Sequence, residues 1–262
     1  MQIIFQGGEA DAHRIDLYEG SESLAGLARA STLVAHYIST SQVRFRAPYS
    51  NQLQYYLTGA QDGSLTILIS EISRIANEAQ AAAARMRASR LLGRVVRRAT
   101  GQEAEGPLTV DGLDIPAGDI DALAEAATPG LQRAHRWIDQ GNKSITIRPG
   151  HGQEFNFNTE TKEYLEAEEV SPQEDIQDVS VGALNVNSRN GRVFFHDLGR
   201  TVPFWVPRDA TDRTIPTLSR YLTQYAEKTG ATVNIRFRRV RYPDGRLKRL
   251  IVSDCYAIAG LE

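Results

Sequence analysis

The sequence SVGALNVNSRNGRVFFHDLGRTVPFWV, residues 180–206, decides the fold of the last third of the chain. Apolar and polar residues alternate on both sides of Asn190-Gly191, and this pair is a strong signal for a tight hairpin because both residues tolerate positive φ. A second break at residues 197–199 precedes a third strand, in which Pro203 favours an edge or bulged position because proline cannot donate to a ladder. We therefore predict consecutive strands over residues 180–186, 192–196 and 201–206.

A helix and two more strands follow this stretch. Apolar residues recur at helical spacing from Ile215 to Tyr225, and Gly230 supplies the expected C-terminal stop. Strands over residues 232–242 and 246–258 are joined by Pro243-Asp244-Gly245, which has the composition of a β-turn. The order of three strands, one helix and two strands resembles the OB-fold, so residues 178–262 are expected to form a small OB-like β-barrel. SH3-like barrels and small α+β sandwiches share parts of the pattern.

The first 158 residues are expected to form an α+β domain. Its longest predicted helix covers residues 71–99, and another runs from Ser21 or Ser23 to about residue 39. Two shorter helices are predicted from Asp119 and from Thr128-Pro129, with a loop over residues 110–116. Strands are predicted over residues 2–5, 12–18, 42–46, 54–58 and 64–70, and a closing hairpin over residues 144–148 and 154–158.

Charge is divided unevenly along the chain, although its net charge is only −2. Residues 177–262 hold 14 basic and 8 acidic residues, whereas residues 1–176 hold 16 and 24. A basic C-terminal part is typical of a surface that meets a polyanion. Seven acidic residues and Ser171-Pro172 fall within residues 159–177, which we predict to be an acidic linker. It is either a solvated connector or a segment that folds back over the basic barrel.

Length and composition narrow the class of protein. A chain of 262 residues suits one large or two ordinary domains, and two are predicted. No run of about 18 apolar residues and no signal-peptide pattern is present, so we expect a cytoplasmic protein without a membrane partner. The single cysteine, Cys255, excludes an intrachain disulfide and a multi-cysteine zinc site, which fits a reducing compartment.

The candidate binding surface combines two loops of the predicted barrel. In OB-folds the ligand lies on strands two and three, flanked by the loops that join strands one to two and four to five. Here aromatic residues lie between two basic groups, a composition suited to single-stranded nucleic acid because cations neutralise phosphate and rings stack on bases. In the alternative, the rings fill the barrel core and the arginines form a solvated rim. The predicted nucleic-acid-binding residues are Arg189, Arg192, Phe195, Trp205, Arg241, Arg246, Lys248 and Arg249.

The predicted helix over residues 71–99 carries six arginines after residue 84 and no acidic residue between Glu78 and Glu103. Arginines late in a helix complement its macrodipole, but six exceed that need. Three roles stay open: packing on the domain's own sheet, pairing with another subunit through small residues, and contact with a polyanion. Packing on the sheet is favoured, because most apolar stripes face a core.

Few residues suggest catalysis. Asp11 and His13 fall on one face of the predicted strand and Asp16 on the other, so the three cannot converge. The five histidines share no metal-ligand spacing, and the chain lacks a phosphate loop with its lysine, a His-Glu-x-x-His motif and a Gly-x-Ser-x-Gly motif. We therefore expect no cofactor and no metal, and a non-enzymatic protein is favoured over an enzyme acting at Asp11 and His13.

Residues 7–16, GGEADAHRID, and Val202-Pro203-Phe204 are similar to uncharacterised two-domain bacterial proteins with an α+β front half and a small barrel behind. This resemblance implies no activity. Two hypotheses follow from the residues. In the first, the barrel binds nucleic acid or another polyanion. In the second, the chain is a protein-interaction subunit of a larger bacterial assembly, in which the barrel and the helix over residues 71–99 contact protein partners or a second copy.

Overall fold

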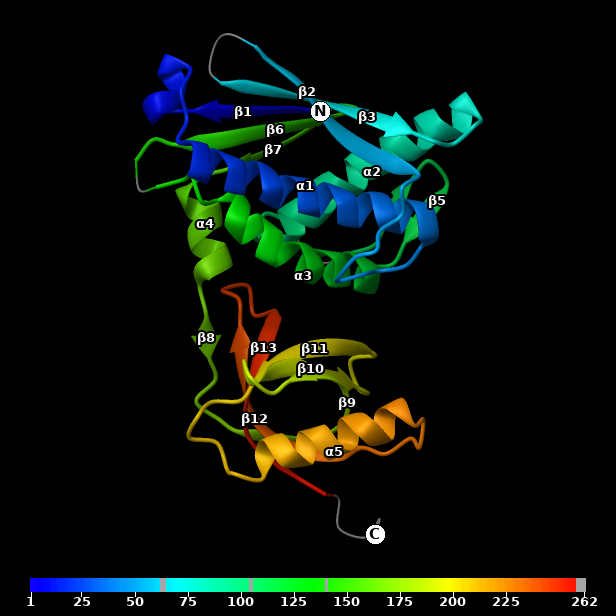
Figure 1. The fold of residues 1–262 in the computed structure, drawn as a ribbon, viewed down its shortest axis with the longest axis vertical. Helices are drawn as coiled ribbons and strands as arrows, with labels where there is room; N and C mark the ends of the chain where they lie inside the picture. The colour runs from blue at the N-terminus through cyan, green and yellow to red at the C-terminus, as the bar shows by residue number, and fades with distance from the viewer. Residues whose placement is uncertain (62–64, 104–105, 140, 258–262) are drawn as a thin grey trace. The chain divides into compact units, whose positions relative to one another are not determined.

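The structure is a computed structural model that describes residues 1–61, 65–103, 106–139 and 141–257. The chain divides into two compact units, Met1–Glu166 and Ala167–Glu262 (Figure 1). The boundary falls inside the predicted linker over residues 159–177. Its first half forms helix α4 (Thr159–Glu166), and its second half holds strand β8 (Glu169–Val170) and the start of the first barrel strand. The acidic stretch is therefore largely structured.

The first unit contains a five-stranded antiparallel sheet with the strand order β2-β3-β1-β6-β7. Helices cover one face of this sheet, and Ile3 and Phe5 of the central strand are buried beneath them (Figure 1). Ile3 lies opposite both Ile67 and Ile147, so one apolar row crosses three strands. The strands are β1 (Gln2–Gln6), β2 (Leu53–Gln61), β3 (Thr66–Ser73), β6 (Ser144–Gly150) and β7 (Gln153–Phe157).

Three long helices form the covering layer: α1 (Leu17–Thr40), α2 (Glu78–Ala99) and α3 (Ala117–Ala134). Helices α1 and α3 approach closely at Gly26, where a Cβ atom would lie 2.2 Å from the carbonyl oxygen of Gly130. The helix predicted over residues 71–99 is confirmed from Glu78 onward. It begins there because the Asn77 side chain accepts a hydrogen bond from the Gln80 amide at 3.0 Å, and residues 71–73 belong to β3.

Three predictions for the part of this unit that follows α1 are wrong. Residues 42–46 form a loop instead of a strand, and Arg29 holds this loop by donating a 2.7 Å hydrogen bond to the Phe45 carbonyl. The two short helices predicted after residue 118 are one helix, because Pro129 lies inside α3 and its missing N–H removes a single helical hydrogen bond. The predicted loop over residues 110–116 contains part of a small hairpin, β4 (Leu108–Val110) and β5 (Leu113–Ile115).

The second unit is a closed five-stranded barrel with the predicted OB-like order. Strand β9 pairs with β10 and β12, strand β11 pairs with β10 and in parallel with β13, and β12 closes the barrel on β13. Helix α5 (Thr214–Ala226) connects β11 to β12 and buries Leu218 against the barrel core. The barrel strands are β9 (Asp175–Asn185), β10 (Asn190–Phe195), β11 (Arg200–Trp205), β12 (Val233–Arg241) and β13 (Leu247–Tyr256).

The start of α5 is fixed to the last strand by a nearly buried carboxylate. Asp254 of β13 accepts hydrogen bonds from Thr211 Oγ1 at 2.5 Å, from Arg213 Nε at 2.9 Å and from the Cys255 amide at 2.8 Å. The hydrogen bonds from Arg213 hold the pKa of Asp254 well below its ordinary value, although burial opposes this shift. The charged form of Asp254 therefore stabilises the attachment of α5.

Candidate functional site

Strand alternation on β10 sorts its aromatic residues between the barrel core and the barrel surface. Val193 and Phe195 point inward, and Phe195 is only 2% exposed, whereas Arg192 and Phe194 lie on the outer side. Phe195 is therefore a correction to the predicted site: its ring packs edge-on against Phe237, with 5.6 Å between ring centroids, and does not face a surface ligand. Phe194 is the outward ring that the prediction missed, and the alternation with buried Val193 is the signal that could have found it.

A row of outward-facing residues crosses four barrel strands at the level of Trp205. Trp205 of β11 lies opposite Asn190 of β10 and Ile251 of β13. Ile251 in turn lies opposite Arg238 of β12. Side chains opposite one another on neighbouring strands lie about 5 Å apart. Because Trp205 is 37% exposed and Arg238 is exposed, the row places a ring and a cation on one continuous surface.

Two more arginines lie beside this row. Arg249 precedes Ile251 by two residues on the same face of β13, and its guanidinium carbon lies 6.0 Å from the centroid of the Trp205 ring, within cation–π range. Arg192 lies opposite Pro203, two residues before Trp205, and donates to Thr201 Oγ1 at 3.3 Å. We name this surface the barrel face, consisting of Arg192, Phe194, Trp205, Arg238, Ile251 and Arg249.

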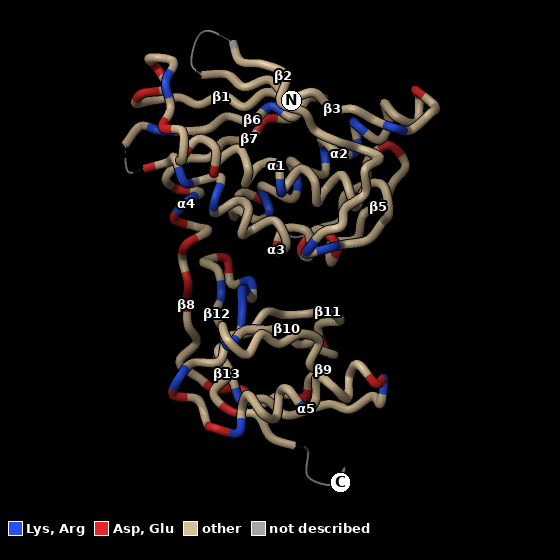
Figure 2. The backbone as a smooth tube through the Cα atoms, in the orientation of Figure 1, with Lys and Arg blue, Asp and Glu red and all other residues tan. Residues whose placement is uncertain are grey.

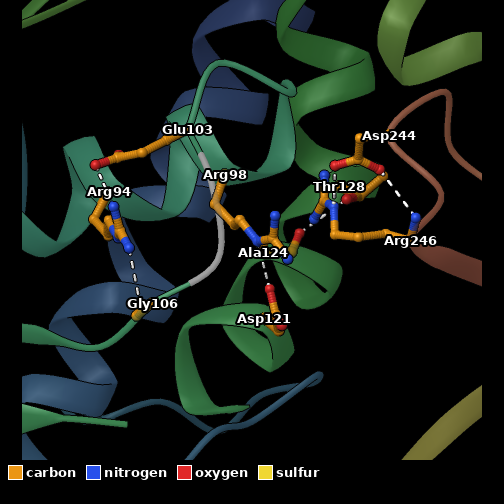
Figure 3. Close-up of polar contacts among 9 residues, drawn as sticks. All are labelled: Arg94, Arg98, Glu103, Gly106, Asp121, Ala124, Thr128, Asp244 and Arg246. Atoms are coloured by element: carbon orange, nitrogen blue, oxygen red, sulfur yellow. Dashed lines mark hydrogen bonds and ion pairs between the residues drawn. The ribbon is translucent and has the colours of Figure 1, made fainter. Parts of the chain in front are cut away.

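The loops of the predicted site use their arginines to hold their own backbone. Arg189, at a positive φ of 53°, donates hydrogen bonds of 3.0 and 2.8 Å to two carbonyl groups that follow β11. Arg241 donates to the Gly245 carbonyl at 2.7 Å. Arg246 pairs with Asp244 at 2.7 Å (Figure 3). These three arginines therefore shape the loops, whereas Arg192, Trp205 and Arg249 come together on the barrel face.

An acidic segment, Ala167–Asp175, lies along the basic strands of the barrel, as the red and blue segments around β8, β12 and β13 show in Figure 2. Glu168 Oε1 lies 3.2 Å from Lys248 Nζ, and Glu168 Oε2 lies 2.7 Å from Arg249 Nη2. Burial alone would raise the pKa of Glu168, but the hydrogen bonds from Arg249 and Lys248 outweigh it and lower this pKa. The geometry matches the alternative in which the acidic stretch folds back over the barrel. We name residues 167–175 the acidic strap.

Five of the six arginines of α2 form ion pairs with described residues of the first unit. Arg94 pairs with Glu103 and donates to the Gly106 carbonyl at 3.0 Å (Figure 3). Arg98 is 5% exposed and pairs with Asp121 of α3 at 2.6 Å (Figure 3). The apolar side of α2 is buried in the same core, which confirms packing within its own domain. Contacts of this helix with a polyanion or a second subunit stay predictions. Its other ion pairs are Arg85–Glu78, Arg87–Asp111 and Arg97–Glu103.

Asp11 and His13 lie in a turn instead of the predicted strand over residues 12–18. Residues Gly8–Ala12 form a 3-10 helix, and His13 follows at a positive φ of 57°. Asp11 Oδ1 accepts a 2.9 Å hydrogen bond from the Gly7 amide and so closes the turn. Both side chains are exposed, and the role that the structure gives to Asp11 is local.

The described parts of the chain hold neither a cluster of metal ligands nor a membrane-spanning helix. Within residues 1–61, 65–103, 106–139 and 141–257, no group of three or more His, Cys, Asp or Glu side chains is arranged to hold a metal ion. In the same ranges, no helix has the length and apolar content that crossing a membrane requires.

Family comparisons match both parts of the chain. Residues 1–114 match a domain of unknown function (DUF7946), and residues 174–256 match a family of unknown function (DUF7947). The second match covers all five barrel strands. No curated protein and no solved structure matches the chain. Each of the two parts of the chain is therefore similar to a domain of unknown function.

Proposed function

We propose that the barrel face binds single-stranded nucleic acid. The observation that carries this proposal is Trp205, which is 37% exposed while the Arg249 guanidinium lies 6.0 Å from the centroid of its ring. Exposure alone does not distinguish Trp205, because Tyr18, Tyr56 and Tyr225 are more exposed, but Trp205 lies on a barrel strand beside a cation. A ring flanked by cations offers a base a stacking surface and offers its phosphates a charge partner.

The cations of the barrel face are spread around this ring. Arg238 lies in the same cross-strand row, and Arg192 lies beside Pro203 on the neighbouring strand. Phosphate contacts of this kind release counterions, which supplies most of the sequence-independent affinity for nucleic acid. Phe194 adds a second outward ring two residues after Arg192. The spacing of these rings and arginines suits a single nucleic-acid strand whose bases stack on the rings while its phosphates contact the arginines.

A single strand fits this surface better than a duplex. Stacking on a protein ring requires a base that is free of its own stack, and single strands supply such bases. The barrel face includes Arg192, Phe194 and Trp205 of β10 and β11, the second and third barrel strands, which are the strands that OB-folds use for oligonucleotides, and it extends onto β13 and β12. The loop arginines, Arg189, Arg241 and Arg246, support the edges of this surface through their own backbone contacts.

Fluorescence anisotropy of a labelled single-stranded oligonucleotide, titrated with the full chain at several salt concentrations, tests the proposal. Trp205→Ala is expected to weaken binding by about 1–3 kcal/mol with little change in salt slope, because it removes stacking and no charge. Arg238→Ala is expected to lower the slope by about one, because it removes one phosphate contact. Arg220→Ala is the matched control, since it removes the same charge from an exposed position on α5 and should leave the slope nearly unchanged.

The intrinsic fluorescence of the wild-type chain locates the contact. The chain has two tryptophans, and Trp137 is only 1% exposed, so quenching by an unlabelled oligonucleotide reports on Trp205. Equal slopes for Arg238→Ala and Arg220→Ala would place the binding surface elsewhere. If the wild-type chain shows no salt-sensitive binding at all, the nucleic-acid proposal fails and the protein-interaction hypothesis replaces it.

A further inference from the structure

The acidic strap reaches the edge of the barrel face through one carboxylate. Glu168 Oε2 lies 2.7 Å from Nη2 of Arg249, the arginine whose guanidinium covers the Trp205 ring. The other oxygen of Glu168 lies 3.2 Å from Lys248 Nζ, and the Lys248 side chain is only 10% exposed. One carboxylate thus engages two of the cations that the sequence predicts for ligand binding.

Further contacts hold the strap along the same two strands. Asp175 pairs with Arg239 Nε at 2.9 Å, and Glu174 accepts a hydrogen bond from Ser253 Oγ at 3.0 Å. Between them and Glu168, strand β8 pairs with β12 over two residues. The strap therefore presents spaced anionic groups to basic strands, as the backbone of a nucleic acid does.

These contacts are individually weak. The side chains of Glu168 and Arg249 are 32% and 36% exposed, so water and salt screen their attraction. Exposed ion pairs contribute little to stability, and a two-residue strand pairing adds few hydrogen bonds. A polyanion that makes several contacts at once can therefore displace the strap.

We propose that the acidic strap is an intramolecular competitor of the ligand of the barrel face. In the free protein, Glu168 occupies Arg249 and Lys248, and a bound polyanion takes these cations when the strap is displaced. This inference rests on the proposed function of the barrel face. The strap then acts as an autoinhibitory contact that lowers the affinity for weak or short polyanions.

Two neighbouring glutamates of the strap form a matched pair for the test. Glu168→Gln and Glu169→Gln each remove one negative charge, but Glu169 is exposed and forms no ion pair with the residues that the structure describes. In the anisotropy titration, Glu168→Gln is expected to bind the oligonucleotide about two- to fivefold more tightly at low salt. Its salt slope is expected to be steeper by about one, because Arg249 loses its ion pair and becomes available to phosphate, whereas Lys248 still donates to the Ala167 carbonyl at 3.1 Å. Glu169→Gln is expected to bind nearly as the wild type does.

Two outcomes of this titration overturn the inference. Weaker binding by Glu168→Gln would mean that Glu168 positions Arg249 over Trp205 in support of the ligand. An equal change in both variants would mean that only the total charge matters. Circular dichroism of each variant accompanies the titration, so that a change in folding is distinguished from a change in binding.

A measurement without nucleic acid separates this inference from the proposed function. Iodide quenching of Trp205 follows the local electrostatic potential, whereas quenching by neutral acrylamide follows access alone. Glu168→Gln is expected to raise iodide quenching and leave acrylamide quenching unchanged, and Glu169→Gln is expected to change neither appreciably. Unchanged iodide quenching in Glu168→Gln overturns the inference whether or not nucleic acid binds. Increased iodide quenching without oligonucleotide binding supports the strap's role and refutes nucleic acid as the ligand.

Discussion

Acid should destabilise the first unit through one buried histidine, His135. Its ring is 1% exposed and lies 4.3 Å from the Phe157 ring, centroid to centroid. In the neutral form, Nδ1 donates to the Leu131 carbonyl at 2.7 Å and Nε2 accepts from Thr161 Oγ1 at 2.8 Å, so both ring nitrogens are satisfied. Burial, only partly offset by the hydrogen bond to Leu131, lowers the pKa of His135 from 6.5 to about 4.

The size and sign of the effect follow from this pKa. The unfolded chain takes up a proton at His135 as the pH falls through 6.5, whereas the folded chain stays neutral there down to about 4. Between these values the free energy of unfolding should fall by about 1.4 kcal/mol per pH unit, because the unfolded state binds the additional proton. The loss over the whole window is about 3 kcal/mol, a large part of the 5–15 kcal/mol typical of a folded protein. Below the folded pKa the loss levels off.

Urea denaturation between pH 7 and pH 4.5 measures this loss. Trp137 reports on the same unit, since it packs edge-on against Phe5, and Trp205→Phe removes the second signal. His135→Gln is the control, because its amide keeps a hydrogen-bonding group but gains no proton. It should be less stable at pH 7 and lose less stability on acidification. His36, whose pKa burial also lowers, contributes equally to both proteins. Equal pH slopes in both proteins would refute the assignment to His135.

Two further substitutions test the packing of each unit. Gly26→Ala is expected to destabilise the first unit by about 1–3 kcal/mol in thermal unfolding, because the new Cβ would lie 2.2 Å from the Gly130 carbonyl oxygen. Gly118→Ala, whose Cβ meets no atom within 4 Å, is the control, and equal stability of the two variants would contradict the close approach. Asp254→Asn is expected to lower the stability of the barrel by about 1–3 kcal/mol at pH 7, because it weakens the attachment of α5. Since the folded pKa of Asp254 is depressed, the difference should shrink as the pH falls below about 3.9, and a constant difference would argue against ionisation as its cause.

The barrel could be predicted from the sequence because local signals encode its order. Pro243-Asp244-Gly245 marks the last hairpin, and the apolar spacing between residues 215 and 225 marks the helix before it. Asn190-Gly191 marks the first hairpin only approximately: the turn is residues 186–189 with the positive φ at Arg189, and the pair itself begins β10. The sheet of the first unit could not be ordered in this way. Its first strand, β1, pairs with β6, so Ile3 meets Ile147 across most of that unit, and no local pattern records such a pairing.

The candidate site was predictable in part for similar reasons. Strand alternation brings Arg192, Trp205 and Arg249 to one surface, and it also marks Arg238 as outward once buried Phe237 is recognised. The hydrogen-bonding partners of an arginine follow no such period. These partners depend on which carbonyl and carboxylate groups the folded loops present. Arg189, for example, donates to two carbonyl groups after β11 and so holds a loop.

The net charge of the barrel unit depends on where the domain boundary lies. Residues 177–262 carry 14 basic and 8 acidic residues, but the strap adds four acidic residues, so the unit from Ala167 carries 14 and 12. A net charge of +2 gives little long-range steering of a polyanion. Any attraction between the barrel and a polyanion must therefore come from local clusters of basic residues. Glu168→Gln and Glu169→Gln give the barrel the same net charge, yet only the first releases Arg249 beside Trp205. The comparison of these two variants therefore measures how the position of a charge affects binding, separately from the effect of the total charge.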